Sequence, residues 1–208
     1  MPQPNRAYSV LDSNRPQYFD QPLYDTVAYP IAGAATLNFF TIPLGQPAVI
    51  RTPLGGAPVA GVLWPKTYRD TNMRVAGIIP GEEMYEFSGF NIVFRRAVLP
   101  ATPELITDLA DRQLIMNNGW FNIRIGMKDV FYIPSDLVPV FNPLIATSWA
   151  GQGLQNNGSA APMYSFRTPL YVQGGQTINI TLNYPGNVVV TTSVDLLLTL
   201  YAQMERPS

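Results

Sequence analysis

The stretch TINITLNY, from Thr177 to Tyr184, alternates apolar and polar side chains without a break. Because a β-strand points successive side chains to opposite faces, this alternation predicts a strand with one dry and one wet face. Turn residues follow at Pro185-Gly186-Asn187, and the run from Val188 to Thr192 is rich in the β-branched residues that suit a pleated surface. We therefore interpret residues 177–204 as the last strand pair of the fold.

The final strand candidate, Val194 to Tyr201, is apolar on both of its faces. One face carries Val194, Leu196, Leu198 and Leu200, and the other carries Asp195, Leu197, Thr199 and Tyr201. A strand of this kind is typical of the centre of a sheet, with a second sheet or a neighbouring subunit over its second face. We expect Leu197 and Tyr201 to lie in such a subunit interface.

The composition describes a protein with few charges. The chain has 208 residues, of which 47% are apolar and only 13% are charged, and its formal net charge is −1. This length suits a single all-β domain, and the charged fraction is about half of that in an ordinary globular protein. A net charge near zero excludes partners bound by bulk electrostatics, such as nucleic acid or an anionic membrane. So few charges favour a surface that is covered by neighbouring molecules.

The chain contains no Cys and no His. Disulfides, thiolate chemistry, the commonest general base and the commonest metal ligand are thereby excluded. We expect no signal peptide, because residues 1–6 lack an apolar segment, and no transmembrane span, because no apolar run approaches roughly 20 residues.

Carboxylates are the catalytic candidates that remain. Glu82 and Glu83 follow a Pro-Gly turn, where solvated acids are usual, and Asp108 and Asp111 lie three residues apart in a predicted helix. A glycoside hydrolase needs two carboxylates about 5 to 9.5 Å apart, and nothing in the sequence marks such a pair. We predict a protein without catalytic residues, cofactor or metal, and keep a glycoside hydrolase as a distant alternative.

Strand, helix and turn signals predict an all-β fold. Strands are expected at residues 23–29, 35–41, 74–79, 85–99, 120–125, 130–133 and 163–172, besides the last pair. One helix is expected at about 103–117, because Thr102 is a good N-cap and Pro103 suits the first helical position. Long Pro/Gly-rich loops are expected at 42–65 and 134–162. About eight strands with one inserted helix predict an antiparallel β-sandwich, specifically a single jelly roll.

Residues 1–22 form a polar, Pro-marked segment that we interpret as an extended N-terminal arm, followed by a single domain at 23–208. The arm is either a disordered tail or a segment that becomes ordered on a neighbouring subunit. Its aromatic residues, Tyr8, Tyr18 and Phe19, favour the second alternative and are predicted interface residues.

The segment from Gly81 to Phe94 resembles part of the virion structural proteins of bacteriophages. The elements that follow are similar too, and the resemblance covers roughly residues 75–208 through the segments Asn118–Gly126, Tyr132–Pro134, Leu137–Pro139, Leu170–Val172, Gln176–Leu182 and Arg206–Pro207. It implies a capsid or capsid-associated protein of a tailless or jelly-roll-based phage, found in the virion and assembled in the host cytoplasm from copies of itself and other virion proteins. The predicted arm holds only Arg6 and Arg15 as basic residues, which argues against direct packaging of the genome.

A second hypothesis is a receptor- or carbohydrate-binding jelly roll of the spike or lectin kind. Its site would be formed by exposed aromatic residues on loops, with Trp64, Trp149 and Tyr164 as candidates. The alternative for these three residues is that they are ordinary buried or interface aromatics.

Overall fold

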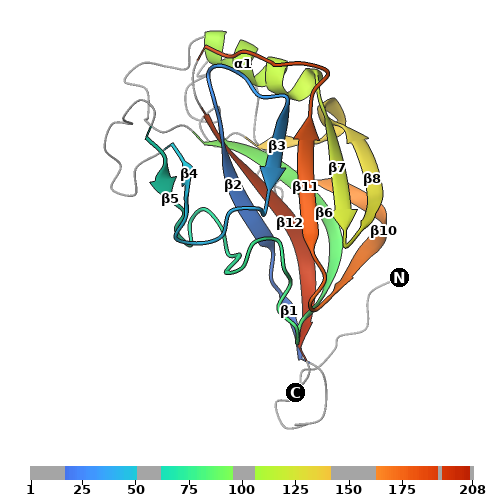
Figure 1. The fold of residues 1–208 in the computed structure, drawn as a ribbon. Helices are drawn as coiled ribbons and strands as arrows, with labels where there is room; N and C mark the ends of the chain where they lie inside the picture. The colour runs from blue at the N-terminus through green and yellow to red at the C-terminus, as the bar shows by residue number, and fades with distance from the viewer. Residues whose placement is uncertain (1–16, 51–61, 96–105, 142–162, 192–193, 207–208) are drawn as a thin grey trace, which may run out of the picture.

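The computed structural model describes residues 17–50, 62–95, 106–141, 163–191 and 194–206. Within these residues the protein consists of β-strands, one α-helix and one short 3-10 helix. The strands form two large sheets that are packed face to face (Figure 1). The predicted all-β, antiparallel sandwich is confirmed.

The first sheet is six-stranded and is built around the last strand of the chain. Its strands are β1 (Gln17–Asp20), β2 (Leu23–Tyr29), β6 (Met84–Arg95), β9 (Val140–Phe141), β10 (Tyr164–Gln173) and β12 (Val194–Arg206). β12 pairs with β1 and β2 on one side and with β6 on the other, and β10 and β9 pair with β6 beyond it. The prediction that the last strand is central is therefore confirmed.

The second sheet is four-stranded and lies in front of β6 and β12 in Figure 1. Its strands follow the order β3 (Thr36–Phe39), β11 (Ile178–Asn183), β7 (Trp120–Ile125) and β8 (Lys128–Pro134). All of its pairs are antiparallel. A separate two-stranded ribbon joins β4 (Pro47–Val49) to β5 (Trp64–Pro65).

The core lies between the two sheets, where alternate residues of each strand meet. Leu196, Leu198 and Leu200 of β12 are buried there with Ile180 and Leu182 of β11. Burying one such side chain stabilises the fold by about 1.5 to 3 kcal/mol, so this layer contributes most of the stability. The side of the sandwich between β8 and β10 is closed by an aromatic cluster that consists of Phe90, Phe121, Phe131, Tyr164 and Phe166.

The helix α1 (Ile106–Asn117) lies across one end of the sandwich (Figure 1). Ile115 and Met116 are buried in the core, whereas Leu114 is exposed. The part of the predicted helix before Ile106 lies outside the described residues. Ser135, in the 3-10 helix η1 (Ser135–Leu137), fastens the end of α1, because its hydroxyl donates to the Met116 carbonyl and accepts from the Gly119 N–H.

Three predictions about the strands are wrong. β11 and β12 are not a pair, since β11 belongs to the four-stranded sheet and β12 to the six-stranded sheet. Residues 188–191 are not a strand, because they belong to the connection that crosses from one sheet to the other. Residues 74–79 form only an isolated bridge, Ile78 to Thr177, because the chain turns at Gly77, which has a positive φ of 59°.

One part of the predicted N-terminal arm is described. Residues Gln17–Asp20 form strand β1, which pairs with the end of β12 from Gln203 to Arg206. The four residues Gln17–Asp20 are too few to show the alternation that predicts a strand, and their pairing partner in β12 lies at the opposite end of the sequence.

Candidate interaction surfaces

Four connections meet at the end of the sandwich that carries α1. The link from β11 to β12 runs along α1 (Figure 1), and both the backbone N–H and the hydroxyl of Thr191 donate to the Asp111 carboxylate, the N–H at 3.0 Å. The same link contacts the β2–β3 turn, since the Val190 N–H donates to the Ile31 carbonyl at 3.3 Å. With Ser135 fastening η1 to α1, hydrogen bonds hold all four segments in place.

This end exposes one apolar side chain on each of the four segments. Ile31 and Val189 lie on the hydrogen-bonded links, and Leu114 and Leu137 lie on α1 and η1; Val189 is 61% and Leu137 is 59% exposed. We call these four residues the α1-end patch. Exposed apolar residues that gather on a fixed framework are typical of an interaction site.

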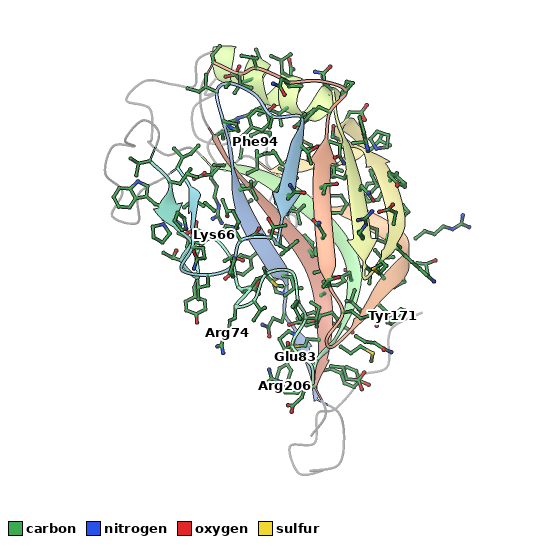
Figure 2. All side chains as sticks on the ribbon, viewed as in Figure 1. Lys66, Arg74, Glu83, Phe94, Tyr171 and Arg206 are labelled. Carbon is green, nitrogen blue, oxygen red and sulfur yellow. The ribbon has the colours of Figure 1, made fainter. Side chains whose placement is uncertain are left out.

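Two charged residues of α1, Asp111 and Arg112, point inward. Asp111 and Arg112 are both buried. Asp111 accepts the hydrogen bonds from Thr191, and the Arg112 guanidinium lies over the Phe94 ring, 5.6 Å from its centroid (Figure 2 labels Phe94 below α1). These charges therefore stabilise the fold and do not add charge to the patch.

A second surface lies on the outer face of the four-stranded sheet, where Asp129 gathers polar groups. Its carboxylate accepts hydrogen bonds from Asn122 Nδ2 at 3.1 Å, from Arg124 Nε at 2.9 Å and from the Tyr132 hydroxyl at 3.1 Å. The hydrogen bonds from Arg124 and Asn122 lower the pKa of Asp129 to about 2. We call Asn122, Arg124, Asp129 and Tyr132 the Asp129 cluster; it is ionised and ordered at neutral pH.

Uncharged polar side chains continue this face across β11 and β3. The register places Thr181 opposite Asn122 and Asn179 opposite Arg124. Next to them lie Asn183 on β11 and Thr36 and Asn38 on β3, which complete a surface of amides and hydroxyls. Trp120 is exposed at the start of β7, beside the cluster. Of the described side chains on this face, only Arg124 and Asp129 form an ion pair.

The predicted interface residues differ in how far the structure exposes them. Tyr18 and Phe19 are exposed on β1, at 44% and 43%, so both are available for contact with another molecule. Tyr201 is half-buried, and its hydroxyl accepts a hydrogen bond from Asn91 Nδ2 at 2.9 Å. Tyr8 lies outside the described residues.

Leu197 requires a correction. It is only 7% exposed in the single chain, so it offers almost no surface to a second subunit. The segment between β3 and β6 folds over this face of β12, because the Ile50 N–H donates to the Asp195 carboxylate at 2.9 Å. The apolar second face was predicted correctly, but the chain covers that face itself.

Two of the three predicted ligand-binding aromatics, Trp64 and Tyr164, lie in the described part of the chain, and both are on strands. Tyr164 lies on strand β10, not on a loop, and its ring packs against Phe90, Phe131 and Phe166. Trp64 is half-buried in the short strand β5. Trp149 lies outside the described residues. Tyr164 is therefore a packing residue, as the alternative interpretation of these aromatics expected.

Two of the carboxylates considered as catalytic candidates, Glu83 and Asp111, have structural partners, and Glu82 is exposed at the turn before β6. Glu83 pairs with Arg206 at 2.6 Å at the end away from α1, where Figure 2 shows the two residues together, and it accepts the Tyr85 hydroxyl at 3.0 Å. Burial, and then the nearby Glu83 charge, raise the pKa of Tyr85. Asp111 binds Thr191, and the side chain of Asp108 lies outside the described part of the chain.

The sequence reading missed a buried ion pair. Lys66 Nζ lies 2.7 Å from Asp25 Oδ1, and both side chains are fully buried (Figure 2 labels Lys66). Asp25 also accepts the Phe40 N–H at 2.6 Å, and Lys66 also donates to the Ile42 carbonyl at 3.0 Å. The sequence contained a signal for this buried carboxylate. Asp25 lies two residues from both Leu23 and Val27, so it shares with them the face of the strand that points inward.

Two further findings concern metal binding and membrane-spanning helices. In the described ranges no three His, Cys, Asp or Glu residues lie close enough to hold a metal ion. No helix within the same ranges is long and apolar enough to cross a membrane.

Comparison with protein-family models, curated proteins and solved structures finds no match to this chain. The resemblance to phage virion proteins thus stays a prediction.

Proposed function

We propose that the protein is a non-enzymatic structural subunit of a viral shell, a jelly roll that assembles with copies of itself and other virion proteins. Strand order supports this fold assignment. When β2, β3, β6, β7, β8, β10, β11 and β12 are counted from first to eighth, one sheet has the order first, eighth, third, sixth. The other has the order second, seventh, fourth, fifth, and both orders are those expected for a jelly roll. Viral capsid domains use this fold, but lectins and cupins use it too, so the fold alone does not decide the function.

The observation that carries the shell proposal is the α1-end patch. A soluble monomer normally places several charged residues over such an end, whereas this chain leaves Ile31, Leu114, Leu137 and Val189 exposed beside one exposed carboxylate, that of Asp136. Hydrogen bonds already hold the segments that carry them, so little conformational entropy is lost when a neighbour covers the patch. The low charge of the whole chain, 13%, points the same way.

Sedimentation velocity of the purified full chain tests this proposal. The wild type is expected to form oligomers at micromolar concentration through an interface of at least about 1,200 Å². Leu137→Asp and Val189→Asp are expected to remain folded by circular dichroism and to sediment as smaller species, because assembly would bury an unpaired charge.

A matched control separates the patch from a general effect of added charge. Met127→Asp places the same charge on another exposed apolar residue, at the β7–β8 turn, where the side chain is 96% exposed. This variant should assemble like the wild type. A wild type that stays monomeric across ordinary salt concentrations contradicts the shell function.

A further inference from the structure

The outer face of the β7–β8 pair combines exposed aromatic rings with a hydrogen-bonded cluster of polar side chains. Tyr132 is 60% exposed and Trp120 is also exposed, so two aromatic rings reach solvent. Trp120 lies opposite Pro134 and Asn122 lies opposite Tyr132 in the strand register, so the two rings are diagonal neighbours. Diagonal neighbours are within reach of one ligand, because their separation is about 7 to 8 Å.

The polar groups next to these rings are fixed in position. Asp129 holds Asn122, Arg124 and Tyr132 together, so the donors and acceptors are oriented before any ligand arrives.

We propose that this face binds a neutral oligosaccharide. The apolar C–H face of a pyranose ring would stack on Trp120 or Tyr132, and its hydroxyls would bind the Asp129 cluster and the amides of β11. The chemistry of the face selects this class of ligand. An anionic ligand would find the Arg124 guanidinium already paired with Asp129. An apolar ligand would strip water from the amides without replacing their hydrogen bonds.

The site differs from the one that the sequence suggested for carbohydrate. Trp64 and Tyr164 do not contribute to it, and it lies on the strands of a rigid sheet. It shares no residue with the α1-end patch, so it goes beyond the shell function and does not depend on it. A shell subunit with a sugar-binding face could attach to a glycan-coated surface.

Retention on immobilised sugars tests the proposal with the full-length protein. The probes are beads carrying neutral gluco-, manno- and galacto-oligosaccharides, with release by the same free sugar. We expect the wild type to bind at least one of them. Trp120→Ala and Tyr132→Ala should each weaken binding by about tenfold, which corresponds to about 1.4 kcal/mol, because each removes an aromatic surface on which the sugar ring stacks.

Tyr171→Ala is the matched control. Tyr171 is a similarly exposed tyrosine, but it lies on β10 in the other sheet (Figure 2). The control should bind as the wild type does, and circular dichroism of all three variants should match that of the wild type. No retention of the wild type on any neutral sugar, or an equal loss in Tyr171→Ala, overturns the proposal. It is also overturned if Trp120→Ala and Tyr132→Ala change only the sedimentation of the protein, because the face is then covered by a second copy of the chain. The shell function is judged separately, by Leu137→Asp.

Discussion

Asp25 faces the space between the two sheets, where an unpaired carboxylate is strongly destabilising. Lys66 supplies the compensating charge, and the Phe40 N–H supplies a second hydrogen bond. Phe40 has a positive φ of 66°, a left-handed conformation that is strained for a bulky residue. The carboxylate therefore anchors two features at once: the segment that carries Lys66 and the strained turn after β3.

Removing one partner of this pair should be costly. Lys66→Met leaves Asp25 buried without its counter-charge, so we expect a loss of about 3 to 5 kcal/mol in the free energy of unfolding. The double variant Asp25→Asn with Lys66→Met should recover much of that loss, because Asn still accepts from Phe40 and no charge is buried. Chemical denaturation of the three proteins measures the effect. If Lys66→Met were as stable as the wild type, the ion pair would not hold this segment.

Asp129 gives a second prediction at the scale of one residue. Its pKa is lowered to about 2, below the value of about 3.9 expected in an unfolded chain. The ionised carboxylate thus contributes stability that is present above about pH 4 and is lost as the pH falls toward 2. Carbon-detected NMR titration of the Asp129 carboxyl measures the pKa, and Arg124→Gln should raise it toward the ordinary value. An unshifted pKa in the wild type would mean that the cluster does not form in solution.

At the scale of the element, β12 decides the stability of the core. Leu198 is fully buried and lies between Asp25 of β2 and Ile92 of β6 in the register. Leu198→Ala should lower the free energy of unfolding by about 2 to 5 kcal/mol, from lost burial and the cavity left behind. Thermal or chemical unfolding measures this loss. Val130→Ala, on the exposed edge strand β8, is the control and should change stability by less than about 0.5 kcal/mol.

Leu197 on the opposite face of β12 should now behave like a core residue. Because the chain itself covers this side chain, Leu197→Asp should unfold the subunit and not merely prevent its assembly. Circular dichroism distinguishes the two outcomes. A folded, monomeric Leu197→Asp variant would show that the covering segment moves aside in solution and that the interface first expected at this strand exists.

The strands show which features of the fold can be predicted from the sequence. The alternation of apolar and polar residues predicted the bounds of β2 and β7 correctly, because that signal is local. It did not predict that β11 and β12 lie in different sheets, because pairing depends on contacts between distant segments. The run at 188–191 resembles a strand in composition, yet its hydrogen bonds go to Ile31 and Asp111. Tertiary contacts outweighed β-propensity there.

The candidate surfaces were harder to predict for the same reason. The Asp129 cluster depends on a register shift between Ile123 and Arg124, which brings Asp129 opposite Arg124. No local pattern announces such a shift. The α1-end patch joins residues from four separate connections, and only the fold brings them to one end. By contrast, the exposure of Tyr18 and Phe19 agrees with their expected availability for contact.

At the scale of the whole molecule, the chain has few charged residues with which to cover its surface. Lys and Arg number 13 and Asp and Glu number 14 in the chain. Several of these charged side chains are buried inside the subunit, as in the Lys66–Asp25 pair and in Asp111 and Arg112 of α1. Under the proposed assembly, contacts between subunits would therefore rely mainly on apolar area, and their response to salt is a direct test.

Association through the α1-end patch should therefore persist when the NaCl concentration is raised. Between about 0.1 and 1 M salt the screening length falls from about 10 to about 3 Å, which weakens contacts between exposed charges but not apolar burial. Sulfate should strengthen the association, because it is excluded from protein surfaces and favours burial. Sedimentation velocity across such a salt series measures both effects. Dissociation with rising NaCl would instead assign the contact to charged groups such as the Glu83–Arg206 pair, at the opposite end of the sandwich. Leu137→Asp would then have no effect on assembly, whereas Arg206→Gln would reduce it.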